Sequence, residues 1–113
     1  MELRVITEND SITHIALKGR LDMMGVNTVE LAFTAHAAAR RKPTIVDLSE
    51  LEYISSIGLR MFITVARTLH RNGVKMALVQ PQPLVGEVLQ VSGFDQLLLI
   101  ARDEPTAFEL IAS

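Results

Sequence analysis

The 113-residue sequence has no cysteine, which excludes disulfide scaffolds, thiol redox chemistry and cysteine-based zinc sites. It has no apolar run close to the roughly 18 residues that a membrane-spanning helix needs, so we expect no direct insertion into a membrane. Positive charge is also not in excess. The formal net charge is −2, which argues against a nucleic-acid-binding protein that neutralises phosphates.

Most signatures of enzymes are missing as well. The six glycines are scattered, and none of them builds a phosphate-cradling loop. The Gly-x-Ser-x-Gly turn of hydrolases is absent, and His14, His36 and His70 lack the spacing of metal ligands. We interpret His36, on the apolar face of a predicted helix, as a packed or rim residue. We therefore predict a protein that is not an enzyme and takes no metal or cofactor.

The composition that is present is typical of a soluble globular domain, with 49% hydrophobic and 21% charged residues. A chain of this length fits one compact domain, so we expect a single domain over residues 1–113. The start, Met1-Glu2-Leu3-Arg4, lacks the basic-then-apolar layout of a signal peptide. We accordingly expect a cytoplasmic location.

Hydrophobic periodicity predicts an α/β fold. The first twenty residues read as a hairpin of two strands that turns at Asn9-Asp10 and ends at Gly19. Further strands are expected at 44–48, 74–79 and 97–100, and helices at about 24–40, 56–72, 83–92 and from 103 onward. This alternation predicts a mixed, mostly parallel sheet of about five strands with about four helices. In such a sheet, sites form beyond the carboxyl ends of the strands, here after Leu17, Leu48 and Val79.

The helical spacing also predicts which side chains face the core. In the first helix the inward face would hold Val29, Ala32, Phe33, His36 and Ala37. In the third it would hold Leu84, Val85, Val88 and Leu89.

Asp47, at the end of a buried strand, has three interpretations. It could be a phosphoacceptor or a metal ligand, but the acid cluster and the lysine of a receiver-type phosphoaspartate site are not in place. We favour the third interpretation, in which its carboxylate braces the following segment by hydrogen bonds to backbone amides.

Two serines, Ser55 and Ser56, stand where a loop becomes the second helix. Either one is a natural N-cap, and a phosphate there would also be tolerated by the positive end of the helix dipole. Gly58, in the first turn, costs helix stability relative to alanine. Its presence indicates a close approach by another backbone or by a side chain of a binding partner, or else simple tight packing of the helix on the sheet.

The stretch from Val46 to Leu59 resembles the signature of the STAS domain, a family named for sulfate transporters and anti-sigma-factor antagonists. Two further segments resemble family motifs, Gly19-Arg20-Leu21-Asp22 and Ser92-Gly93-Phe94-Asp95-Gln96-Leu97, so the resemblance covers essentially the whole chain. The family's fold agrees with the element order derived above.

The resemblance to stand-alone antagonists implies a regulatory binding module. Such a module binds an anti-sigma factor that is also a serine kinase of the histidine-kinase-like ATPase superfamily, and a serine phosphatase reverses the phosphorylation. The implied partner-binding residues are Asp22, Ser55, Ser56, Ile57, Gly58, Leu59 and Arg60, with the exposed side of the second helix, including Arg67. The alternative that the resemblance implies is a cytoplasmic subunit of an ABC-type phospholipid transporter.

One position departs from the family's usual Asp-Ser-Ser/Thr-Gly pattern. The residue directly before the glycine is normally the phosphoacceptor, and here it is Ile57. Ser55 stands at the position where the family usually has the aspartate. Either the switch has moved to Ser56 or Ser55, or the module binds permanently and has no switch. Ser56 is the better candidate of the two because it is nearest the matched position.

Overall fold

The computed structural model describes residues 1–93 and 97–112, and it confirms the predicted order of strands and helices. The elements are β1 (Glu2–Glu8), β2 (Thr13–Leu21), α1 (Met23–Phe33), the π-helical turn η1 (Thr34–Ala38), β3 (Thr44–Ile54), α2 (Ser56–Arg71), β4 (Met76–Val79), α3 (Pro83–Val91), β5 (Leu99–Ala101) and α4 (Glu104–Ala112).

The sheet runs in the order β1-β2-β3-β4-β5, with β1 antiparallel to β2 and every other pair parallel. The predicted hairpin turn is confirmed. The side chain of Asn9 accepts hydrogen bonds from the backbone N–H groups of Ser11 (2.8 Å) and Ile12 (3.0 Å). This is the local bonding that makes asparagine a turn residue.

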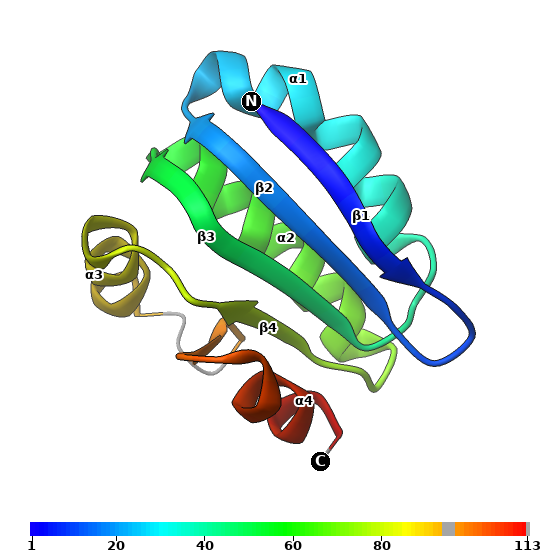
Figure 1. The fold of residues 1–113 in the computed structure, drawn as a ribbon. Coiled ribbons are helices and arrows are strands. Elements are labelled where there is room, and N and C mark those ends of the chain that lie inside the picture. Colours follow the sequence, from blue (N-terminus) through cyan, green and yellow to red (C-terminus); the bar gives the residue numbers. More distant parts are fainter. Residues whose placement is uncertain (94–96, 113) are drawn as a thin grey trace.

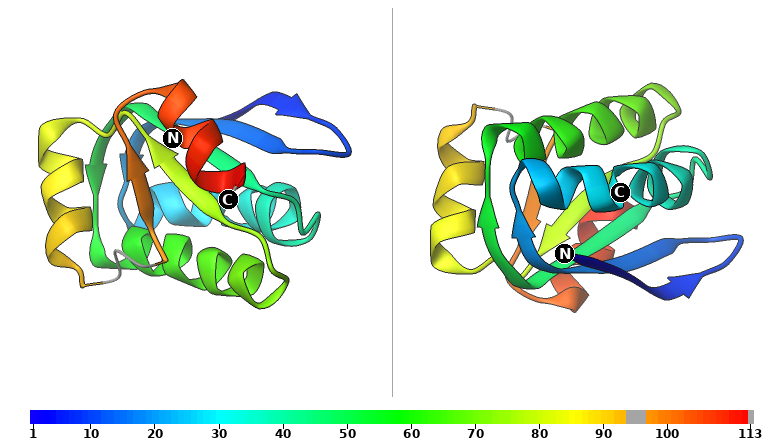
Figure 2. Two further views of the ribbon diagram at one scale, coloured as in Figure 1. Left: turned by 90° about the horizontal axis from the view of Figure 1, so that it is seen from below. Right: turned by 90° about the horizontal axis from the view of Figure 1, so that it is seen from above.

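The helices cover the sheet unequally. α1 and α2 lie side by side on one face, α4 covers the other face over β4 and β5, and α3 stands beside the end of β3 (Figures 1 and 2). Between the sheet and the α1–α2 layer lies the larger core, where the rings of Phe33 and Phe62 are 5.6 Å apart between centroids. A smaller cluster that includes Ile45, Val79 and Ile111 fills the space under α4.

Two strands are longer than predicted. β3 continues to Ile54 rather than ending at Leu48, and β2 continues to Leu21 rather than ending at Gly19. The second half of β3 pairs with β2 but extends beyond β4, and the register of the β2–β3 pairing shifts twice there. Its buried residues, Leu48, Leu51 and Ile54, are therefore three positions apart, with exposed Ser49, Glu50 and Glu52 between them. The continuous apolar run that signals a strand buried on both faces is absent there, and the loops expected after Leu17 and Leu48 lie instead after Leu21 and Ile54.

The other boundaries differ by smaller amounts. β4 begins at Met76 rather than at residue 74, and β5 spans Leu99–Ala101 rather than 97–100. The first helix gives way to the turn η1 after Phe33, before residue 40 is reached. A π turn holds one residue more per hydrogen bond than an α turn. Within η1 both Ala38 and Ala37, which was predicted to face inward, are buried.

Two predicted core side chains lie on the surface. Ala32 is exposed because the buried face of α1 follows Val26, Val29 and Phe33. Leu84 is 59% exposed because the inward face of α3 is set by Val85 and Leu89, one turn apart.

Candidate functional site

Two helices begin at one edge of the sheet, directly after two neighbouring parallel strands. β2 ends at Leu21 and α1 follows its cap Asp22, whereas β3 ends at Ile54 and α2 follows its cap Ser55. The two turns are tied together, because the Leu21 carbonyl accepts hydrogen bonds from both the backbone N–H (3.0 Å) and the hydroxyl (2.9 Å) of Ser55. The carboxyl ends of parallel strands thus bring Asp22 beside the start of α2, at the edge where sites form in open α/β sheets.

The two serines at the start of α2 have different environments. The Ser55 oxygen accepts the backbone N–H of Gly58 at 3.2 Å while its hydroxyl donates to Leu21, so Ser55 is the N-cap. Ser56 is the first residue of the helix, and its side chain is exposed. A phosphate on Ser55 would replace a hydroxyl that already makes two structural hydrogen bonds. The Ser56 side chain is exposed to solvent and makes no such demand.

Asp22 has a structural role, and part of its side chain is also exposed. Its Oδ1 accepts the backbone N–H of Gly25 at 2.9 Å and caps α1, and its Oδ2 lies 3.8 Å from the Nε of Arg20. The Arg20 guanidinium in turn lies 4.4 Å above the centre of the Tyr53 ring, within cation–π range. The Arg20–Tyr53 pair was not predicted from the sequence. Predicting it would have required the register of β2 against β3, which sets Arg20 opposite Tyr53.

Gly58 is explained by packing within the chain. A Cβ at this position would lie 2.7 Å from Leu21 Cγ and 2.8 Å from the Leu21 carbonyl oxygen. This confirms the interpretation as tight packing of the helix on the sheet, because the close neighbour is Leu21 at the end of β2. Gly25, at the matching position in α1, is tighter still, since a Cβ there would lie 2.1 Å from the carbonyl oxygen of Arg20.

The remaining predicted binding residues divide between the core and the surface. Ile57 and Leu59 are partly buried and pack against the main core, so each offers only part of its side chain. Arg60 is exposed, one turn beyond Ser56 on the same side of α2. The side chains that point outward are thus Ser56 and Arg60, with a portion of Ile57 beside them.

Asp47 makes the hydrogen bond that the bracing interpretation predicted. Its Oδ1 accepts the backbone N–H of Ser49 at 2.8 Å, although it lies within β3 rather than at its end. His36 lies at the rim, with Nδ1 2.6 Å from Oε2 of Glu8. Over residues 1–93 and 97–112, no group of three or more metal-ligating side chains is placed to hold an ion.

Within the same residues, no helix is both long enough and apolar enough to cross a membrane. The motif segment Ser92–Leu97 is only partly described, since residues 94–96 lie outside the described ranges.

Residues 4–107 match the model of the STAS domain. The chain belongs to the STAS domain family. Among its relatives, the BtrV protein of Bordetella bronchiseptica, named as an anti-sigma factor antagonist, is 29% identical over 98 residues, which are 87% of this chain and 84% of that protein. The anti-sigma-B factor antagonist of Staphylococcus aureus is 22% identical over 92 residues, 81% of this chain and 85% of that protein.

Solved structures agree with this STAS domain in fold. The antagonist SpoIIAA in its unphosphorylated form superposes with a TM-score of 0.77 at 20% identity, covering 96% of each chain. The phosphorylated form of the Bacillus protein gives a TM-score of 0.71 at 19% identity, covering 96% of this chain and 99% of that one. At such identities the likeness shows the fold alone, which is the mixed five-stranded sheet with four helices predicted from the sequence.

Proposed function

We propose that this STAS domain is an anti-sigma factor antagonist, which binds an anti-sigma factor through the surface at the start of α2. The observation that carries the proposal is the arrangement of that surface: Ser55 and Gly58 are engaged within the fold, while Ser56 and Arg60 project from it. The relatives that cover most of the chain are named for the same activity.

The proposed regulation is phosphorylation of Ser56 by the bound partner, acting as a serine kinase, with a serine phosphatase restoring binding. Ser56 is supported over Ser55 because the Ser55 hydroxyl already serves as cap and as donor to Leu21. Ile57 has no hydroxyl to modify. A phosphate at the first position of a helix is favoured electrostatically, and it adds about two negative charges to the docking surface.

The binding claim is tested with the anti-sigma factor from the same cells and a matched pair of variants. Ile57 and Met24 are each the second residue of their helix, two positions after the caps Ser55 and Asp22. Ile57→Asp should weaken binding at least about a hundredfold, because it places an unpaired charge in the centre of the proposed interface. Met24→Asp should change the dissociation constant less than about fivefold, since Met24 is not in the proposed set. Titration calorimetry measures both.

The outcomes separate the alternatives. Equal affinity of the wild type and Ile57→Asp would remove the start of α2 from the interface. Co-purification of the chain with a permease and an ATPase, and no binding to an anti-sigma factor, would contradict the proposed function in favour of a transporter subunit.

A further inference from the structure

One edge of the sheet is open to a further strand. Among the strands that the structure describes, β1 stands at this edge, so one side of its backbone has no partner (Figure 1). A bulge between Val5 and Thr7 interrupts the pairing of β1 with β2 on the other side. It leaves residues 2–5 as a regular stretch whose outward N–H and C=O groups can join another strand. The opposite edge offers less, because β5 has three residues.

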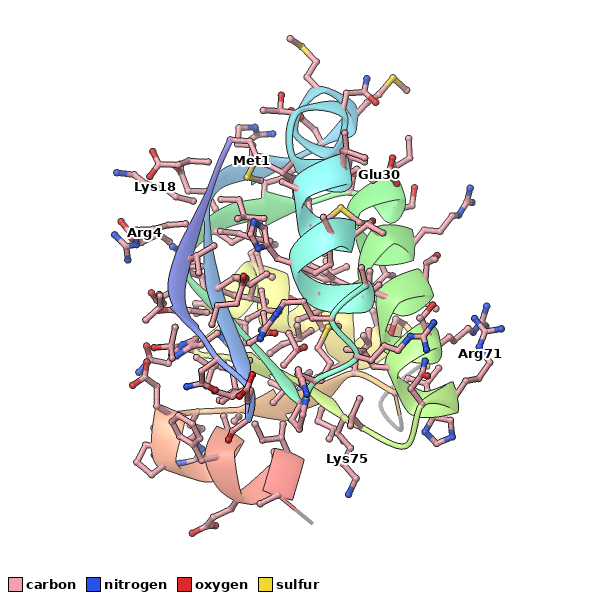
Figure 3. All side chains as sticks on the ribbon, turned by 90° about the vertical axis from the view of Figure 1, so that its right-hand side faces the viewer. Met1, Arg4, Lys18, Glu30, Arg71 and Lys75 are labelled. Carbon is pink, nitrogen blue, oxygen red and sulfur yellow. The ribbon has the colours of Figure 1, made fainter. Side chains whose placement is uncertain are left out.

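This regular stretch of β1 carries two opposite charges. Glu2 and Arg4 lie two residues apart, so they share a face of the sheet, and Figure 3 shows Arg4 pointing away from the helices. Both side chains are exposed, and neither forms an ion pair within the described part of the chain. Leu3, between them, turns to the other face and packs against the main core. An added strand would therefore meet one negative and one positive charge in a fixed order.

We propose that β1 pairs antiparallel with β1 of a second copy of this chain, about a twofold axis at Leu3. This register sets Glu2 opposite the partner's Arg4, and the symmetry repeats the ion pair. A pairing centred on Arg4 would set two arginines opposite each other, and one centred on Val5 would set Glu2 opposite the partner's Glu8. Both of these registers oppose like charges, which destabilises a strand pair. Centres beyond Val5 fall in the bulge.

The flank of α1 beside β1 is uncharged. Met24, Thr28 and Ala32 are exposed and four residues apart, so they lie along one side of the helix. That side faces the β1 edge, since Met24 and Thr28 line a hollow of about 400 Å³ together with Met1. Glu30, the one charged residue in the sequence of α1, lies on the other flank, toward α2 (Figure 3). The flank therefore suits contact with a second uncharged flank.

The strand edge and the helix flank fit the same occupant. A twofold axis perpendicular to the sheet joins the two sheets into one and sets both helix layers on the same face. Because α1 packs on β1 and β2, the two α1 flanks then approach each other over the joined strands. A short edge alone is small beside the roughly 800 Å² per partner of a stable interface, and the flank adds apolar area. The inference does not rest on the proposed function, since it uses neither Ser56 nor Ile57.

Sedimentation equilibrium of the full chain tests the register by a charge swap. We expect a dimer with a dissociation constant below about 100 μM. Arg4→Glu sets a carboxylate opposite each Glu2 and should weaken the dimer more than about tenfold, whereas Glu2→Arg with Arg4→Glu inverts both ion pairs and should restore it to within about threefold of the wild type. Arg102→Glu, the same change at an exposed arginine after β5, should stay within about twofold.

A second pair of variants tests the helix flank. Ala32 and Asn27 are both exposed on α1, with Asn27 on the flank that holds Glu30. Ala32→Lys should weaken the dimer more than about fivefold, because two like charges meet across the twofold axis. Asn27→Lys should stay within about twofold of the wild type, since the same charge stands away from the interface.

Three results would overturn the inference. The first is a chain that stays monomeric up to about 1 mM. The second is equal weakening by Arg4→Glu and Arg102→Glu, which would make the effect one of net charge. The third is a charge swap that does not restore the dimer, because Arg4 would then not face Glu2. Circular dichroism of each variant checks that a lost dimer is not a lost fold.

Discussion

Helices α1 and α2 begin alike and differ in what they expose. Each follows a parallel strand, each has a side-chain cap, Asp22 or Ser55, and each cap accepts the N–H of a glycine three residues on. In both helices a Cβ at that glycine would collide with the end of β2. The motifs Asp-Met-Met-Gly and Ser-Ser-Ile-Gly are thus two versions of one way of docking a helix start against a strand end.

The outward faces of the two helices have different chemistry. α1 presents two large apolar side chains, Met24 (78% exposed) and Leu31 (85% exposed), among polar ones, whereas the exposed side chains of α2 include Ser56, Arg60, Arg67 and Arg71. Since the caps and glycines are shared, they explain how the helices are held and do not distinguish their functions. A function specific to α2 must come from the side chains that differ, which are Ser56, Ile57 and the arginines.

The glycines should give the largest effects on stability. Gly25→Ala sets a methyl group 2.1 Å from a backbone oxygen, so we expect a loss of about 3 kcal/mol in the free energy of unfolding. Gly58→Ala should cost about 2 kcal/mol, because two of its three closest atoms belong to the Leu21 side chain, which can shift. Chemical denaturation measures both.

Gly86→Ala is the matched control for these two variants. Gly86 lies inside α3, and its Cβ would meet Pro81 at an ordinary contact distance of 3.6 Å. The change should be neutral or should stabilise by about 0.5–1 kcal/mol, since alanine is the better helix former. A similar loss in all three variants would refute a special constraint at the two helix starts.

The caps should give smaller and nearly equal losses. Asp22→Ala should cost about 1 kcal/mol, and Ser55→Ala about 1.5 kcal/mol because its hydroxyl also donates to Leu21. Ser56→Ala, on the exposed neighbour, should stay within about 0.5 kcal/mol of the wild type. Thermal or denaturant unfolding gives the order of the three stability losses. A larger loss for Ser56→Ala than for Ser55→Ala would show that Ser55 is not the cap.

The order of the elements could be predicted because each has a clear period or a clear stop. Gly73 after α2 and the buried run at 44–48 are such signals, and both hold in the structure. The second half of β3 could not be predicted, because its buried residues Leu48, Leu51 and Ile54 recur every three positions rather than every two. The turn η1 left no signal in the sequence, since inserting one residue into a helical turn depends on packing.

The candidate site could be predicted by residue but not by role. The sequence indicated that Ser55 or Ser56 caps α2 and that Gly58 meets a close neighbour. Which serine is the cap depends on a shift of one residue, and the neighbour Leu21 is distant in sequence. Both facts come from the pairing of β2 with β3, which sets Leu21 opposite Ile54.

The most direct measurement is phosphorylation of the purified chain by the anti-sigma factor kinase and ATP, followed by mass spectrometry and a binding assay. We expect phosphate on Ser56, loss of the label in Ser56→Ala but not in Ser55→Ala, and loss of kinase binding by the modified chain. Phosphate on neither Ser56 nor Ser55, or undiminished binding with Ser56 fully modified, would contradict a switch at the start of α2.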